Sequence, residues 1–369
     1  MKTKVLVLGA GHIGSVIAEL LGATEDYEVT LADQKGERLS QTSTTVSTLQ
    51  LDVHDTKALN AAMADFNVVV SACPFFLNVA IAEAAKVHGV HYFDLTEDRE
   101  TTKKIRELAE GASTNFMPQC GLAPGFISIA AHDLCKRFER LRRVRMRVGA
   151  LPLFPANALQ YNLTWSTAGL INEYCNPCEV ISDGVSREVL PLEGYEQFSL
   201  DGVTYEAFNT SGGLGTLCET LAGSVDYLSY KTIRYPGHCD LVRFLCNDLQ
   251  LCDRRDLFLD VLERAVPVTV QDVVLIFITA SGDRHGRLTQ ETYTRKVYHG
   301  MVGQQHMAAI QITTAAGVCA AVDLQREGKL PATGFVRQED VSLADFMANR
   351  FGRLYEQHGR REDATAMLP

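Results

Sequence analysis

The first 120 residues alternate short apolar runs with amphipathic stretches. Lys4 to Leu8 is a leucine- and valine-rich run, and from Ile13 to Leu21 apolar residues recur at helical spacing. The same alternation continues along the chain, with further strands expected at residues 28–33, 48–52, 67–72, 91–95 and 115–120 and helices at 79–87 and 97–110. Strands that alternate with helices predict an α/β fold with a doubly wound parallel sheet.

The pattern changes after residue 125. A helix over 126–138 leads into residues 142–148, where Val144, Met146 and Val148 alternate with arginines, which predicts a strand with one basic face. We interpret that face as solvated or intersubunit, with an anion site as the alternative. Later strands are expected at 159–165, 203–208, 273–279 and 292–298, and helices at 306–325 and 343–355. The prediction is three segments: residues 1–125, a mixed α+β domain over 126–304, and residues 305–369 returning to the first domain.

Composition narrows the function classes. The chain has 369 residues with a formal charge of −10, so nucleic acid is an improbable main partner. No apolar run approaches the roughly 20 residues that span a bilayer, which excludes a membrane segment. A small-molecule substrate or another subunit is the expected partner.

The ten cysteines are scattered along the chain and are read as free thiols in a reducing cytoplasm. Cys175 and Cys178 form a lone C-x-x-C without a second pair at zinc spacing, so no metal site is expected. A redox role for this pair is disfavoured as well.

The strongest motif is Gly9-Ala-Gly11-His12-Ile13-Gly14, which follows a strand and opens a helix. In a dinucleotide-binding turn Gly9 permits the tight bend, Gly11 lets backbone N–H groups approach a pyrophosphate, and Gly14 lets the helix pack closely. His12 and Ile13 would line the same turn. The alternative is a nucleotide-free core that uses these glycines only for packing.

Asp33 ends the second strand at the position of a ribose-binding carboxylate, which favours NAD over NADP. Lys35 nearby weakens the repulsion of a 2′-phosphate. Residues after later strands would also lie along the cofactor, because ligands of open α/β sheets bind at the carboxyl ends of strands. These residues are Asp52, Val53, Ala72, Cys73 and Pro74, although Cys73 fits a plain buried thiol equally well.

The second domain holds the polar clusters expected to bind a substrate. Arg234 offers a planar fork for a carboxylate, and His238 exchanges protons near neutral pH. The loop after residue 208 supplies side-chain and backbone donors. The full set is Tyr161, Asn162, Glu173, residues 209–213, Lys231, Arg234 and His238. Each of them also fits a structural role, as a turn residue, a surface ion pair or a core histidine.

Several of these segments together resemble the saccharopine dehydrogenase-like family, and within it the bacterial lysine 6-dehydrogenases. The segments are Gly121-Leu-Ala-Pro-Gly125, residues 161–166, 169–173 and 207–213, and Tyr230-Lys-Thr-Ile-Arg-Tyr-Pro-Gly-His238. The resemblance implies a Rossmann domain, an inserted mixed-sheet substrate domain, and a homodimer formed through that sheet. It also implies that Thr96 and Cys120 lie near the cofactor and that Asn209, Thr210 and Ser211 lie near the substrate.

One departure from the family pattern bears on the substrate. Where the saccharopine-forming reductases place an arginine after Trp-Ser, this chain has Thr167-Ala168-Gly169, which disfavours a dicarboxylated adduct. The resemblance therefore implies NAD-linked deamination of the ε-amine of L-lysine to aminoadipate semialdehyde, which cyclises to piperideine carboxylate. A saccharopine- or carboxynorspermidine-type condensing reductase and a catalytically silent NAD-binding regulator are the alternatives.

That reaction needs a group that takes a proton from the amine, because a protonated amine cannot release hydride from its carbon. His238 or Glu173 is the expected acceptor. Arg234 and the loop at 209–211 are expected to hold the α-carboxylate, with Tyr161 beside the substrate.

Overall fold

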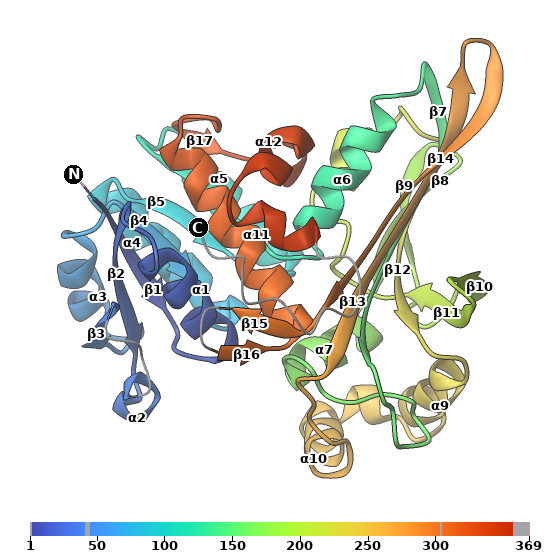
Figure 1. Ribbon diagram of the computed structural model, residues 1–369, viewed down its shortest axis with the longest axis horizontal. Helices are drawn as coiled ribbons and strands as arrows, with labels where there is room; N and C mark the ends of the chain where they lie inside the picture. The colour runs from blue at the N-terminus through green and yellow to red at the C-terminus, as the bar shows by residue number, and fades with distance from the viewer. Residues whose placement is uncertain (1, 41–44, 303–304, 357–369) are drawn as a thin grey trace. The chain divides into compact units, whose positions relative to one another are not determined.

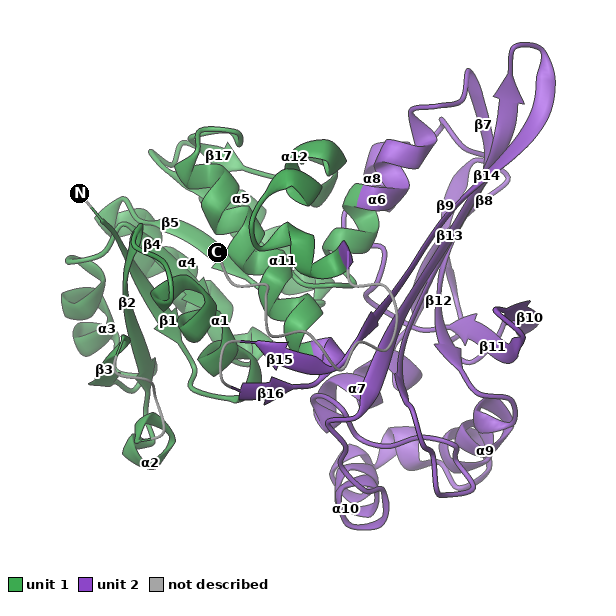
Figure 2. Cartoon of the chain, in the orientation of Figure 1, with its two compact units in different colours: residues 1–129, 311–355, 369 green, residues 130–310, 356–368 purple. Residues whose placement is uncertain are grey.

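The computed structural model describes residues 2–40, 45–302 and 305–356, which form two compact units (Figures 1 and 2). Unit 1 holds residues 1–129 and 311–355, and unit 2 holds residues 130–310. Most of the segment predicted to return to the first domain thus belongs to unit 1. Each unit has a sheet and a core of its own.

Unit 1 contains a seven-stranded sheet in the order β17-β6-β5-β4-β1-β2-β3. Every neighbouring pair is parallel, which confirms the predicted doubly wound α/β sheet. Its strands are β1 (Thr3–Leu8), β2 (Tyr27–Asp33), β3 (Ser47–Gln50), β4 (Val68–Ser71), β5 (His91–Asp94), β6 (Asn115–Met117) and β17 (Gly334–Phe335). The edge strand β17 comes from the last part of the chain.

Helices cover both faces of this sheet, because successive strand residues alternate between two buried environments. Leu6 and Leu8 of β1 join the core beneath α3, α4 and α5, while Val5 and Val7 are buried on the other face. There α11 lies beside α1, with the Cys319 thiol 3.9 Å from the Ile17 carbonyl. The helices are α1 (His12–Gly22), α2 (Gly36–Leu39), α3 (Thr56–Met63), α4 (Asn78–His88), α5 (Arg99–Ala109), α11 (Ala309–Arg326) and α12 (Leu343–Ala348), with 3₁₀ turns η1 (Phe75–Leu77), η4 (Gln338–Asp340) and η5 (Gly352–Glu356).

Unit 2 is built on a mixed sheet in the order β10-β11-β12-β7-β13-β14, which confirms the α+β prediction. Its strands are β7 (Arg140–Pro152), β10 (Glu196–Leu200), β11 (Val203–Asn209), β12 (Tyr227–Arg234), β13 (Asp272–Arg284) and β14 (Arg287–Tyr298), with β8 (Cys178–Ser182) and β9 (Val185–Val189) attached through β12. The strands β15 (Gly300–Val302) and β16 (Gln305–Met307) form a separate two-stranded sheet. The helical segments are α6 (Phe126–Cys135), α7 (Thr167–Cys175), α8 (Leu217–Leu221), α9 (His238–Arg243), η2 (Phe244–Asp248), η3 (Leu251–Asp253) and α10 (Arg255–Ala265). In this sheet β12 and β7 run parallel, and the other named pairs are antiparallel.

Three sequence predictions differ from the structure. Residues 159–165 form no strand and make one isolated bridge, between Leu163 and Val268, because their apolar side chains pack into the unit 2 core instead. The helix expected from residue 306 begins at Ala309, whose backbone N–H is bonded by the Asp272 carboxylate. The helix expected over 343–355 stops at Ala348, because Asn349 has an extended backbone conformation, and the chain then continues into a 3₁₀ turn at Gly352–Glu356.

The prediction of ten free thiols is wrong for two of them. Cys175 and Cys252 form a disulfide across 77 residues, and eight cysteines are free. The fold places the end of α7 beside η3, with 5.4 Å between the two Cα atoms, a separation typical of disulfides. No described helix is long and apolar enough to cross a membrane.

Candidate functional site

The glycine turn after β1 is sterically closed to larger residues at two positions. Gly9 has a φ of +99°, and its N–H donates to the Ala32 carbonyl at 2.7 Å. A Cβ added to Gly9 would lie 2.9 Å from the Ala72 carbonyl oxygen. A Cβ added to Gly14 would lie 1.8 Å from the Gly9 carbonyl oxygen. These two glycines therefore shape the turn itself.

Gly11 differs because an added Cβ there would meet no atom of the protein. It immediately precedes α1, whose first turn has no side-chain cap and no acidic residue. His12 and Ile13, the first residues of that helix, are exposed and half-buried. The free N–H groups and the open space beside Gly11 fit a pyrophosphate at the helix N-terminus.

Asp33 ties the end of β2 to this turn. Its carboxylate accepts hydrogen bonds from the backbone N–H groups of Ala10 at 2.9 Å and of Lys35 at 2.8 Å. Each oxygen keeps a second lone pair for a ribose hydroxyl. Arg38, which the sequence reasoning did not single out, lies 3.6 Å from the same carboxylate and is half-exposed. A basic residue five positions after the aspartate was the signal that could have found it.

The other predicted cofactor residues follow strands of unit 1. Ala72 donates its N–H to the Leu8 carbonyl at 2.9 Å and so borders the glycine turn. Burial raises the pKa of the Cys73 thiol to about 11, and Pro74 precedes η1. Asp52 is exposed, and hydrogen bonds from His54 lower its pKa. Val53 is partly buried and packs against the core of unit 1.

Thr96 and Cys120 are held at the ends of neighbouring strands by one buried carboxylate. Asp94 accepts hydrogen bonds from the N–H groups of Thr96 and Gln119, each at 2.9 Å. The Cys120 N–H donates to the Asp94 carbonyl at 2.8 Å. Burial raises the pKa of Asp94 to about 6. Thr96 and Cys120 thus follow the carboxyl ends of their strands, at the same end of the sheet as the glycine turn.

In unit 2 the substrate candidates centre on Arg234, the last residue of β12. Its Nε donates to the Tyr174 hydroxyl at 3.0 Å, and one terminal nitrogen donates to Thr232 and to the Ile233 carbonyl at 2.5 and 2.9 Å. The guanidinium lies 4.9 Å from the Tyr161 ring centroid. Only 2% of Arg234 is exposed, so its cation is fixed in an aromatic, desolvated site.

Glu173 on α7 faces the second terminal nitrogen of Arg234. Its Oε2 lies 3.7 Å from that nitrogen, is buried, and makes no hydrogen bond among the described residues. Burial raises the pKa of Glu173 to about 7, against the lowering effect of the Arg234 charge. This carboxylate can therefore take or release a proton near neutral pH.

His238 is joined to Arg234 through Tyr174, a residue that the sequence reasoning missed. The His238 Nδ1 donates to the Leu159 carbonyl at 2.8 Å, which leaves Nε2 to accept from the Tyr174 hydroxyl at 2.9 Å. Burial and then the Arg234 charge lower the pKa of His238 to about 3. Because its basic nitrogen is already used, Glu173 is the better placed of the two predicted proton acceptors.

The loop at 209–211 divides between two faces of the sheet. Ser211 lies against α7. Its N–H donates a hydrogen bond to the Glu173 carbonyl at 3.1 Å, and its hydroxyl donates one to the Asn172 carbonyl at 3.0 Å. The Thr210 hydroxyl is buried without a partner among the described residues. Asn209 pairs with Lys231, three residues before Arg234, so its side chain lies on the opposite face. The structure therefore does not bring the Asn209 side chain to Arg234.

Two family patterns together match most of the chain. The saccharopine dehydrogenase NADP binding domain matches residues 5–116, and the saccharopine dehydrogenase C-terminal domain matches residues 121–359. The chain belongs to the saccharopine dehydrogenase family of NAD(P)-linked oxidoreductases. This confirms the resemblance drawn from the sequence motifs.

Curated relatives in this family are distant and longer. The chain is 26% identical over 263 residues to saccharopine dehydrogenase [NADP(+), L-glutamate-forming] of Saccharomyces cerevisiae, covering 66% of this chain and 58% of the relative. It is 24% identical over 252 residues to the mitochondrial alpha-aminoadipic semialdehyde synthase of Mus musculus, and the match covers 62% of this chain and 27% of the mouse protein. The chain thus spans about a quarter of the mouse protein's length and less than two thirds of the yeast protein's.

Solved structures show the same fold. The apo saccharopine dehydrogenase (L-Glu forming) from Saccharomyces cerevisiae gives a TM-score of 0.77 at 17% identity and covers 94% of this chain and 97% of that one. The homospermidine synthase of Legionella pneumophila in complex with NAD gives a TM-score of 0.68 at 13% identity, and the match covers 96% of this chain and 90% of that one. Membership of the saccharopine dehydrogenase family supports a nicotinamide nucleotide as the cofactor, and the matching pattern is described as NADP binding.

Proposed function

We propose that the protein is an NAD(P)-dependent dehydrogenase that oxidises a carbon–nitrogen bond of a small amino acid, with the ε-amine of L-lysine as substrate and NAD as the preferred cofactor. Family membership supports the reaction class. The observation that carries the proposal is the buried Glu173 carboxylate, which has an unbonded oxygen 3.7 Å from the Arg234 guanidinium. A buried acid and a buried cation at one place suit a substrate that carries both charges.

In this proposal Glu173 removes a proton from the substrate ammonium and so frees the nitrogen lone pair. The bound nicotinamide supplies the hydride acceptor. Loss of hydride from the carbon then leaves an iminium, which water converts to an aldehyde with release of ammonia. Glu173 suits the first step because its pKa of about 7 makes it both ionised above neutral pH and able to accept a proton.

Arg234 would hold the α-carboxylate of the substrate. Its Nε and one terminal nitrogen are committed to Tyr174, Thr232 and a carbonyl, while the other terminal nitrogen faces Glu173 at 3.7 Å. The hydroxyls of Thr210 and Tyr161, which lack a close hydrogen-bond partner within the described part of the chain, lie buried in the same unit and supply further donors. A fixed guanidinium binds a carboxylate at a low entropic cost.

A condensing reductase of the saccharopine type is the second candidate, because the yeast relative above is named a saccharopine dehydrogenase. Such an adduct has more carboxylates than lysine and needs a further cation. The chain has Thr167-Ala168-Gly169 where the reductases place an arginine. Lys231, the other buried cation of β12, lies on the face opposite Arg234. These features favour the smaller substrate.

The deciding experiment is NADH formation by the purified protein at alkaline pH with L-lysine, D-lysine, ornithine, putrescine or glutamate, with saccharopine assayed separately. Turnover of L-lysine with NAD above that with NADP supports the proposal. Turnover of saccharopine alone would establish the condensing reductase instead. Tight NAD binding without turnover of any compound would favour a catalytically silent NAD-binding regulator.

A further inference from the structure

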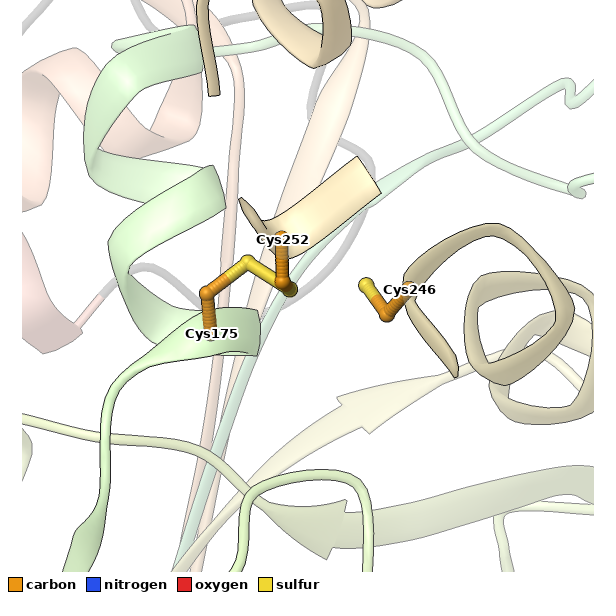
Figure 3. A group of neighbouring side chains, drawn as sticks. All are labelled: Cys175, Cys246 and Cys252. Atoms are coloured by element: carbon orange, nitrogen blue, oxygen red, sulfur yellow. A yellow bond between two sulfur atoms is a disulfide. The ribbon is translucent and has the colours of Figure 1, made fainter. Parts of the chain in front are cut away.

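Three cysteine sulfurs lie together in unit 2 on three separate elements. Cys175 ends α7, Cys246 lies in the π-helical turn η2, and Cys252 lies in η3. All three Sγ atoms fall within 4.8 Å of one another. Figure 3 shows the Cys246 sulfur directed toward the disulfide that joins the other two. None of these sulfurs has a part in the reaction proposed above.

The surrounding packing holds this cluster together independently of the disulfide. Arg255, the first residue of α10, donates to the side-chain oxygens of Asn172 and Asn176 at 2.8 and 2.7 Å, and so binds the end of α7 to the segment after η3. The Cys252 sulfur also lies 3.9 Å from the Tyr174 carbonyl. Cys246 belongs to the apolar core, and the other two sulfurs pack against it. The three elements are thus positioned by contacts that survive reduction.

We propose that Cys175, Cys246 and Cys252 form a binding site for one soft metal ion, with Zn²⁺ the first choice, in the protein whose disulfide has been reduced. A phosphine or dithiol reductant supplies the two electrons that break the S–S bond, and two protons complete the thiols. The ion then binds three thiolates and releases three protons. Thiolate sulfur is the ligand type that Zn²⁺ and Cu⁺ prefer in proteins.

The geometry is close to what such an ion needs. Tetrahedral Zn²⁺ has Zn–S bonds of about 2.3 Å, which places its sulfur ligands about 3.8 Å apart. The Cys246 sulfur lies within 4.8 Å of both other sulfurs, and reduction lets the sulfurs of Cys175 and Cys252 move apart to this spacing. A shallow surface hollow is lined by Cys252 and the five residues after it, so solvent reaches the site and can supply a fourth ligand.

Cobalt binding to the full-length protein tests this proposal without any assay of the dehydrogenase reaction. The protein is reduced with a phosphine, desalted anaerobically and titrated with Co²⁺. We expect thiolate-to-cobalt charge-transfer absorption that saturates at one ion per chain, disappears on addition of Zn²⁺, and is absent before reduction. Because each thiolate contributes, Cys246→Ala should lose about a third of the band and bind at least about tenfold more weakly.

Cys178→Ala is the matched control, since Cys178 is a buried free thiol three residues after Cys175. Its sulfur lies 3.8 Å from the Asn176 carbonyl oxygen. This variant should keep the whole band. Cys252→Ser, at a half-buried position, repeats the test if Cys246→Ala fails to fold, and thermal unfolding of each variant followed by circular dichroism reports its folding.

A second readout is chemical protection. Zn²⁺ should shield Cys175, Cys246 and Cys252 from alkylation in the reduced protein and leave Cys73 reactive. Absence of a cobalt band after reduction, or a band that Cys246→Ala leaves unchanged, would overturn the three-sulfur site. A failure of this test leaves the lysine dehydrogenase proposal unaffected, because the two rest on different residues.

Discussion

At the scale of single residues, the unusual feature is an acid buried beside a cation without a direct hydrogen bond. Glu173 and Arg234 are 8% and 2% exposed, yet their nearest charged atoms are 3.7 Å apart. An unpaired buried carboxylate oxygen costs free energy, and such a cost is typical of functional sites. The pair is therefore the first target for mutation.

Glu173→Gln should lower kcat by at least about a hundredfold, because the amide cannot accept the substrate proton. In the unmutated protein kcat/KM should fall as the pH drops through about 7, since burial raises the Glu173 pKa to that value and only the ionised form is a base. The pH–rate profile checks both, with Glu188→Gln on exposed β9 as the control. An inflection near pH 7 that persists in Glu173→Gln would remove the residue from this role.

Arg234→Ala should raise KM for the amino acid at least tenfold, on the order of 1.5–3 kcal/mol for a charged hydrogen bond. Arg187→Ala, on the exposed strand β9, is the control for loss of a positive charge. NAD affinity should stay the same, because the nucleotide turn lies in the other unit. Steady-state kinetics with NAD titration distinguishes these outcomes, and an unchanged KM would exclude Arg234 from carboxylate binding.

Asp33 and Arg38 should set the cofactor preference together. Asp33→Ser removes the charge that repels a 2′-phosphate and leaves Arg38, which lies 3.6 Å from that carboxylate, to bind it. We expect the ratio of kcat/KM for NADP over NAD to rise at least about tenfold. Adding Arg38→Ala should cancel most of this gain. If the double variant keeps the full gain, Arg38 has no part in cofactor choice.

At the scale of elements, the turn between β1 and α1 separates two roles of glycine. Gly14→Ala should destabilise unit 1 by about 1–3 kcal/mol, because its Cβ would overlap the Gly9 carbonyl. Gly11→Ala should leave thermal stability nearly unchanged, since its Cβ meets no protein atom, and yet weaken NAD binding. Thermal unfolding and NAD titration of both variants test this contrast. Equal loss of stability in the two would contradict it.

The sequence predicted the elements whose periodicity is long or whose turns carry glycine, such as β1 with α1 and the paired strands β13 and β14. It could not predict β17, because two residues at a sheet edge carry no periodic signal. Residues 159–165 alternate like a strand, but their apolar side chains are used for core packing. A disulfide across 77 residues depends on the tertiary fold alone.

The candidate site was predicted in part. Glycines, Asp33, Glu173 and Arg234 stand out by type and spacing. Tyr174 did not, because a tyrosine on an apolar helix face looks like any core residue until its hydroxyl is seen between Arg234 and His238. The face of Asn209 depends on the register of β11 with β12, which the sequence does not reveal.

At the scale of the whole molecule, the proposed nucleotide site and the proposed substrate site rest on two separate cores. NAD at about a hundred times its Kd should stabilise unit 1 by about 2.7 kcal/mol through mass action. Calorimetry should therefore show that NAD raises the melting temperature of unit 1. Gly11→Ala should reduce this shift. An NAD effect of full size in Gly11→Ala would place the nucleotide elsewhere.

The homodimer that the family resemblance implies stays a prediction.

Unit 1 is assembled from two parts of the chain separated by the whole of unit 2. Its last components include β17 beside β6, and Asp323 of α11, which accepts a hydrogen bond from the Tyr27 hydroxyl at 2.7 Å. A ribosome makes the chain from the N-terminus, so unit 2 can fold while unit 1 still lacks α11 and its edge strand. The nucleotide fold is thus completed only after the whole of unit 2 has been synthesised. Until then, β6 presents an open edge to its surroundings.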